Sequence, residues 1–132
     1  MNIGELSQLS GISAKMIRHY EKTGMVRSAS RQGNGYRGYE TQDVSVMQFI
    51  RRARDLGFST ERLRALVKLW QDGTRPSREV KAIALAHIAE IDLDIARLQS
   101  LRHDLKTVSD ACKGDQNPAC AILETLSGSD AG

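Results

Sequence analysis

The feature that most constrains this fold is a run of 33 residues, positions 77–109, without glycine or proline. As a helix rising 1.5 Å per residue, this segment is about 50 Å long. Its apolar residues recur in steps of three and four and form one stripe: Val80, Ala84, Ile88, Ile91, Ile95, Leu98, Leu101, Leu105 and Val108. Most of this stripe has no other segment of the chain to cover it. We therefore expect the helix to pair with a second copy in an antiparallel two-helix coiled coil, making a homodimer.

The rest of the composition indicates an ordinary globular protein. Of 132 residues, 40% are hydrophobic and 27% charged, so one compact domain, or a small domain with a helical appendage, is expected. No apolar run approaches the ~20 residues that cross a bilayer. Residues 1–5 include Glu5, and no apolar stretch typical of a signal peptide follows them. We expect a cytoplasmic protein with no membrane partner.

Charge is distributed unevenly along the chain. Residues 1–70 contain 12 Lys and Arg and 6 Asp and Glu, which gives a net charge of +6. Residues 71–132 contain 7 Lys and Arg and 10 Asp and Glu, which gives a net charge of −3. A basic half beside an acidic half indicates that only the first faces a polyanion, and nucleic acid is the leading partner. All six aromatic residues also lie within residues 1–70, which places the globular core there.

The N-terminal residues predict a helix-turn-helix. Apolar residues recur at helical spacing from Ile3, and residues 10–13 then supply a stop, a tight turn and an N-cap serine, Ser13. A second helix follows over residues 14–23, and Gly24 ends it. Its outer positions carry Lys15, Arg18, His19 and Lys22, while Met16, Ile17 and Tyr20 share the other side.

A small basic wing is predicted next. Residues 31–39 contain Asn34-Gly35, a strong signal for a two-residue type I′ hairpin, with Arg31 and Arg37 on the arms. Two further helices follow, capped by Thr41 and Ser59, the second with Leu63, Leu66, Val67 and Trp70 facing inward.

The predicted fold is therefore mainly α. A winged helix-turn-helix domain spans residues 1–70, a polar linker 71–76 and the dimerisation helix 77–110. A loop with a short helix occupies residues 111–127, and a polar, frayed tail residues 128–132.

Helix-turn-helix plus wing is a geometry for reading double-stranded DNA. Lys15 and Arg18 are the best candidates for base-edge contacts, because they extend from the N-terminal part of the second helix and arginine suits bidentate contact with guanine. The alternative for both is an ordinary exposed charge. For Tyr36 and Tyr39, phosphate contact through the hydroxyl and packing of the wing on the helix both remain open.

Two cysteines, Cys112 and Cys120, follow the long helix with seven residues between them. They are too few and wrongly spaced for a structural zinc site. Two thiolates on a short loop can instead bind a soft monovalent ion such as Cu(I) in nearly linear two-coordination. A disulfide and two unrelated free thiols remain alternatives. No Ser/His/Asp set, phosphate-binding loop or carboxylate pair stands out, so we do not expect an enzyme.

Taken together, the motifs closely resemble the MerR family of transcriptional regulators, and within it the CueR branch of copper-efflux regulators. The resemblance covers residues 1–127 and rests on both cysteines and on four short segments. These are residues 1–5 (MNIGE), 16–21 (MIRHYE), 34–37 (NGYR) and 54–58 (RDLGF).

The resemblance implies a dimer that activates transcription by distorting a promoter whose spacer is too long for RNA polymerase. It places Arg18 and Tyr20 of the second helix, and Tyr36 and Arg37 of the wing, at DNA-contact positions. His19 and Arg31 lie beside them. Arg54 falls where an interdomain or backbone contact is expected.

The resemblance also implies an effector class. Mercury and zinc sensors of the family carry a cysteine where this chain has Ser77, which favours monovalent ions here. Lys81 matches a lysine that approaches from the other subunit and offsets the −1 charge of a two-thiolate site holding one Cu(I). Lys113 and Pro118 lie in the loop where copper- and gold-responsive relatives differ, so Cu(I), Ag(I) and Au(I) are not ranked.

Two rival functions remain open. In one, Cys112 and Cys120 form a reversible disulfide switch in a DNA-binding regulator. In the other, the chain is a cytosolic metal-buffering protein and residues 1–70 are only a scaffold. The basic wing, the recognition helix and the charge split favour the metal-sensing regulator over the buffer.

Overall fold

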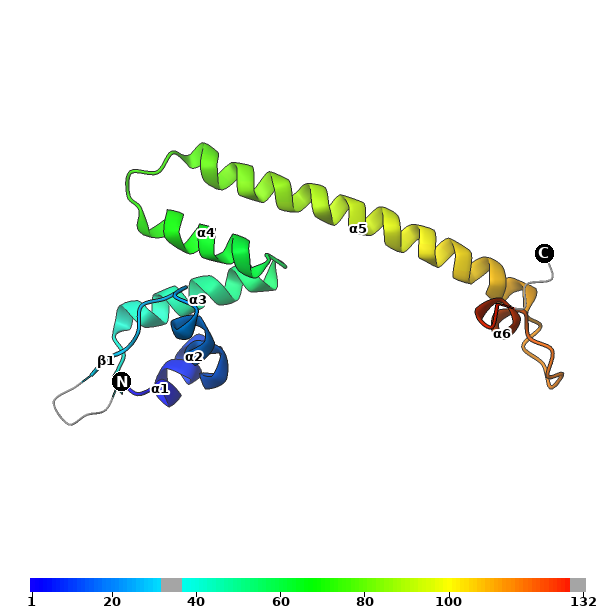
Figure 1. The fold of residues 1–132 in the computed structure, drawn as a ribbon, viewed down its shortest axis with the longest axis horizontal. Coiled ribbons are helices and arrows are strands. Elements are labelled where there is room, and N and C mark those ends of the chain that lie inside the picture. The colour runs from blue at the N-terminus through cyan, green and yellow to red at the C-terminus, as the bar shows by residue number, and fades with distance from the viewer. Residues whose placement is uncertain (32–36, 129–132) are drawn as a thin grey trace. The chain divides into compact units, whose positions relative to one another are not determined.

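The computed structural model describes residues 1–31 and 37–128 (Figure 1). The mainly α fold predicted from the sequence is confirmed. The elements in chain order are α1 (Ile3–Ser10), α2 (Ala14–Lys22), β1 (Ser30–Arg31), β2 (Arg37–Gly38), α3 (Thr41–Asp55), α4 (Thr60–Gln71), α5 (Ser77–Ala111) and α6 (Ala121–Leu126). The chain divides into two compact units, Met1–Ala84 and Leu85–Gly132, with α5 continuing from one to the other.

Side-chain caps explain where the first unit's helices begin. Asn2 precedes α1, and its side chain accepts a hydrogen bond from the Glu5 N–H. The predicted caps Ser13 and Ser59 do the same for their helices, each accepting from the backbone N–H of the third helical residue. The predicted cap Thr41 is wrong. It is the first residue of α3, and the N-cap is Glu40, whose backbone N–H donates to Asp43.

The core of the first unit is formed where α1 packs against α2 and α3, and α3 against α4. Leu6, Ile17, Ile50 and Val67 are among its most deeply buried side chains. Trp70 departs from the prediction: it stacks on Phe49 with ring centroids 4.4 Å apart, but 40% of its surface stays exposed. It covers the core from outside because it sits at the end of α4.

Gly11 makes the turn between α1 and α2 possible. It has φ +76° as the C-cap of α1, and a Cβ there would meet the mobile end of the Arg51 side chain. A left-handed conformation costs an L-residue about 1–2 kcal/mol, so Gly11→Ala should lower the free energy of unfolding by at least that amount in urea titrations. Gly73→Ala is the control, because nothing lies within 4 Å of its added Cβ. Equal losses in both variants would contradict this account of the turn.

α5 is a 35-residue helix, and none of its residues is buried within this chain. Its first turns contribute Val80 and Ile83 to the edge of the first unit's core. Further along, the stripe from Ile88 to Leu105 keeps its large apolar side chains 39–61% exposed. No helix in the described part of the chain has the length and apolarity to span a membrane.

In the second unit, α6 lies beside the end of α5. Ile122, Thr125 and Leu126 of α6 line an apolar hollow of about 220 Å³ together with four residues of α5: Leu101, Asp104, Leu105 and Val108. The turn formed by residues 112–120 joins the two helices and brings both cysteines to one end of this helix pair. Of the predicted frayed tail, residues 129–132 lie outside the described residues.

Candidate metal centre and nucleic-acid interface

α2, the second helix of the predicted helix-turn-helix, presents three basic side chains to solvent. Lys15, Arg18 and His19 are all exposed, whereas Ile17 is fully buried against the core. The 3.6-residue period of the helix separates these two sets, because one side must pack on α1. The exposed set is available to a partner outside the chain.

Tyr20, also predicted to contact DNA, lies much deeper than the three basic side chains. It is 2% exposed, and its hydroxyl accepts a hydrogen bond at 3.3 Å from Nη1 of Arg54 on α3. The ring therefore packs in the core, and its hydroxyl lies beside the Arg54 guanidinium. Arg54 remains exposed and links α3 to the recognition helix through this contact.

The predicted wing is present as two short antiparallel strands. β1 and β2 pair in the register Ser30 with Gly38 and Arg31 with Arg37, so both predicted wing arginines sit at directly opposed positions. A two-residue turn at Asn34-Gly35 would instead pair Arg31 with Gly38, so the register expected from that turn is wrong by one residue. The connecting residues 32–36, which include the predicted Asn-Gly turn and Tyr36, lie outside the described residues.

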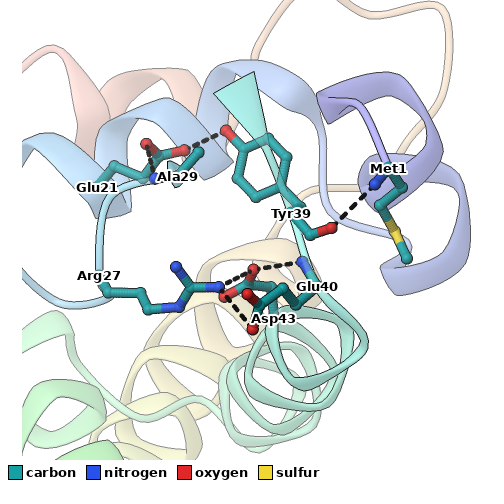
Figure 2. Close-up of polar contacts among 7 residues, drawn as sticks. All are labelled: Met1, Glu21, Arg27, Ala29, Tyr39, Glu40 and Asp43. Carbon is teal, nitrogen blue, oxygen red and sulfur yellow. Dashed lines mark hydrogen bonds and ion pairs between the residues drawn. The ribbon is translucent and has the colours of Figure 1, made fainter. Parts of the chain in front are cut away.

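A group of buried and partly buried polar residues lies at the base of the wing (Figure 2). Tyr39 is 5% exposed, and its hydroxyl donates to Oε1 of Glu21 at 2.5 Å. Of the two alternatives left open for Tyr39, the structure supports packing of the wing onto the helix. Nearby, Arg27 pairs with Asp43 at 2.7 Å and with Glu40 at 3.5 Å.

Glu21 and Asp43 were not singled out from the sequence as important residues. Glu21 follows Ile17 by four residues, so helical spacing already placed it on the buried side of α2. An acidic residue at an inward-facing helix position could have identified Glu21 from the sequence, because a buried carboxylate needs hydrogen-bond donors.

The two cysteines meet in the second unit. Their sulfur atoms are 3.5 Å apart, both residues are partly buried, and neither is in a disulfide. The turn between them is organised locally by side-chain oxygens, since Asp115 accepts from the Asn117 N–H and Asn117 from the Ala119 N–H. The short spacing and this locally hydrogen-bonded turn together bring the thiols close to each other.

Cys120 is the N-cap of α6, and this position affects its acidity. Hydrogen bonding from the backbone N–H of Leu123, followed by that from the Cys112 thiol, holds the pKa of Cys120 below its usual value. A lower pKa favours the thiolate, which is the form that binds metal ions.

The pair suits a two-coordinate ion. With metal–sulfur bonds of about 2.3 Å, thiolates on opposite sides of one ion lie about 4.6 Å apart, so these sulfurs need to open by only about 1 Å. Among residues 1–31 and 37–128, no group of three or more His, Cys, Asp or Glu side chains is placed to hold a metal ion. The described chain therefore offers two soft donors and no complete tetrahedral zinc set.

Ser77 and Lys81 lie at the start of α5 in the first unit, whereas both cysteines belong to the second. Ser77 and Lys81 are exposed and line one surface hollow of about 420 Å³ with Arg75 and Val80. Their spacing of four residues puts both on the same side of the helix.

Comparison with known proteins identifies relatives along nearly the whole chain. The family described as MerR HTH family regulatory protein matches residues 1–69, and the one described as MerR, DNA binding, matches residues 44–108. The HTH-type transcriptional regulator HmrR of Sinorhizobium medicae is 49% identical over 96% of this chain and 86% of its own length.

A second relative and a solved structure extend this likeness. The HTH-type transcriptional regulator CueR of Escherichia coli O157:H7 is 41% identical over 97% of this chain and 95% of its own length. The crystal structure of the transcription regulator PbrR691 from Ralstonia metallidurans in complex with lead(II) superimposes with a TM-score of 0.84. It is 28% identical and covers 96% of this chain and 98% of that one.

Proposed function

Since the chain belongs to the MerR family of HTH regulatory proteins, we propose that it is a metal-responsive transcriptional regulator that senses Cu(I) or another monovalent soft ion. In this proposal it activates a metal efflux or detoxification promoter. The family consists of transcriptional regulators, so the chain is not an enzyme. A relative from Rhizobium meliloti named heavy metal-dependent transcription regulator 2 supports the metal response.

The observation that carries the choice of ion is the pair of thiols 3.5 Å apart, without a third donor grouped beside them in the described residues. Soft thiolates favour Cu(I), and low coordination suits a monovalent d¹⁰ ion. Two thiolates around one such ion leave a net charge of −1. In our proposal, Lys81 of the second subunit offsets this charge, and Ser77 beside it supplies no thiolate.

The regulator acts as a homodimer in this proposal. The exposed apolar stripe of α5 supports pairing with the α5 of a second copy, because large apolar side chains along one helix face are costly to leave in water. Antiparallel pairing brings the start of one α5 towards the end of the other, where that subunit's cysteines lie.

For DNA, we assign base-edge contacts to Lys15 and Arg18 of α2, with His19 beside them as a further contact to DNA. Phosphate contacts flanking them are assigned to Arg31, Tyr36 and Arg37 of the wing. Arg54 is hydrogen-bonded to Tyr20 of α2 and is exposed, so we assign it a contact with the DNA backbone. The metal-bound dimer distorts an over-long promoter spacer so that RNA polymerase can engage both of its elements.

Footprinting and in vitro transcription on the promoter upstream of this protein's own coding sequence test the proposal. The promoter is combined with the dimer and RNA polymerase at buffered free Cu(I). Transcription should rise with Cu(I), with an altered footprint in the spacer and little change in occupancy. A protein that occupies the promoter but does not respond to Cu(I), Ag(I) or Au(I) would overturn the assignment of the effector.

Arg18 and Arg37 should affect DNA binding differently. Arg18→Ala should weaken operator binding by ~1 to 3 kcal/mol and relax base preference at one half-site position, because a bidentate base contact is lost. Arg37→Ala should lower affinity for all sequences alike and reduce the salt dependence. Gel-shift series over single base substitutions measure both. Identical base profiles for the two variants would contradict this division between base reading and phosphate binding.

The sulfur distance also supports the second candidate, a disulfide switch, because closing to the ~2.05 Å of a disulfide needs only local movement. Two measurements separate the candidates. Under reducing conditions with buffered Cu(I), a metal sensor activates and a disulfide switch does not. With an oxidant and no metal, a disulfide switch activates and a metal sensor does not.

A further inference from the structure

One carboxylate at the end of the recognition helix holds both sides of the wing. Glu21 is 8% exposed on the last turn of α2. Its Oε2 accepts from the backbone N–H of Ala29 at 3.4 Å, just before β1, and its Oε1 accepts from the Tyr39 hydroxyl at 2.5 Å, just after β2. Figure 2 shows both contacts converging on the same side chain.

Other contacts at this place anchor the backbone on either side. The Tyr39 N–H donates to the Met1 carbonyl at 2.8 Å, and the Tyr39 carbonyl accepts from the Met1 nitrogen at 2.9 Å. Arg27, ahead of the wing, pairs with Asp43 in the first turn of α3. The chain around Tyr39 is thus held independently of its hydroxyl, so removing that hydroxyl should leave the fold intact.

We infer that Glu21, acting with Tyr39, is a positioning residue for DNA recognition: it sets the wing at a defined place relative to the recognition helix. Charge-assisted hydrogen bonds in a buried setting are strong and directional. Arg18 lies three residues before Glu21 on α2, while Arg31 and Arg37 lie on the strands that Glu21 holds. The Glu21 carboxylate therefore determines how the proposed phosphate-binding arginines are placed relative to the proposed base-reading arginine.

This inference rests on the proposed function, because it assumes that Arg37 binds DNA. Its consequence is a coupling: Arg37 contributes to affinity only while the wing is held in place. In the otherwise unchanged protein, Arg37→Ala should weaken operator binding about fivefold, the effect of losing one hydrogen bond of typical net strength. In a Tyr39→Phe background the same change should cost less than about twofold. Arg18→Ala should cost the same in both backgrounds, because Arg18 is on α2 itself.

The experiment is a set of double-mutant cycles measured by fluorescence anisotropy on full-length dimer with operator DNA. Glu21→Gln replaces Tyr39→Phe in a second cycle and should give the same coupling with Arg37→Ala. Val67→Ala on α4 is the control for general destabilisation, since it truncates a core side chain 2% exposed outside the wing base. In the Val67→Ala background, Arg37→Ala should keep its full fivefold effect.

Amide hydrogen exchange on the DNA-free protein provides the independent measurement. Tyr39→Phe should accelerate exchange at residues 29–31 and 37–38 by about tenfold or more, because the strands open locally. Exchange should stay unchanged in α2 and at the N–H of residue 39, which still donates to the Met1 carbonyl. Val67→Ala should not show this local pattern. Additive effects of Tyr39→Phe and Arg37→Ala, or unchanged exchange at the strands, would overturn the positioning role. If Arg37→Ala has no effect on its own, the proposed wing contact fails, and the exchange result alone decides the role of Glu21.

Discussion

Cys112→Ser and Cys120→Ser should each abolish Cu(I)-dependent activation while changing operator affinity by less than about twofold, because the proposed metal site and the proposed DNA-binding surface are formed by different residues and only their coupling is lost. Each variant leaves one thiolate of a pair whose sulfurs are 3.5 Å apart. A hydroxyl is a poor ligand for a soft monovalent ion, so the remaining cysteine should not hold it.

In vitro transcription across a buffered Cu(I) series measures this loss, and gel shift measures operator affinity on the same preparations. Ser109→Ala, at an exposed position three residues before Cys112 on α5, is the control and should respond as the unchanged protein does. Transcription that still rose with Cu(I) in either cysteine variant would remove this loop from the sensing mechanism. A large loss of operator affinity would show that the loop is needed for DNA binding as well.

The second large effect concerns which ions are admitted. Ser77→Cys should extend the response to Hg(II), and in part to Zn(II), by adding a third thiolate from the other subunit of the proposed antiparallel dimer. Divalent ions carry one more positive charge than Cu(I), and Zn(II) prefers about four ligands, so a third donor changes their binding most. Lys81 should reduce the gain, because its charge favours a site with net −1 charge.

Reporter assays with Cu, Ag, Hg and Zn salts measure this change in response. Ser77→Ala is the matched control, because it removes the hydroxyl without adding a thiolate and should keep the original ion profile. Ser77→Cys combined with Lys81→Gln should respond to Hg(II) at lower concentration than Ser77→Cys alone. An unchanged profile in folded, dimeric Ser77→Cys protein would mean that Ser77 only begins α5 and that selectivity resides in the loop.

Features that depend on near neighbours in the chain could be predicted from the sequence. Ser13 and Ser59 cap their helices as expected, because an N-cap side chain bonds to a backbone N–H only three residues ahead. The length of α5 followed from the absence of glycine and proline. The two thiols meet because only seven residues, turned by local side-chain hydrogen bonds, separate them.

Features that depend on packing depth could not be predicted in the same way. Periodicity placed Tyr20 on the inner side of α2, yet the family resemblance suggested a DNA contact, and only the packed core showed its ring 2% exposed beneath Arg54. Trp70 was expected to face inward but is partly exposed over Phe49. Helical spacing defines a direction for each side chain, whereas its exposure depends on which other helix covers it.

By itself, the sequence determined the helix-turn-helix, a wing with one arginine on each arm, the long α5 with its apolar stripe and the two-cysteine turn. Each follows from residues within a few positions of one another or from a repeating local pattern. Only the tertiary structure decided that Glu21 joins Ala29 to Tyr39 across the base of the wing. That contact spans 18 residues and depends on how α2, the strands and α3 pack together, because a buried carboxylate finds its donors in space and no local spacing specifies them.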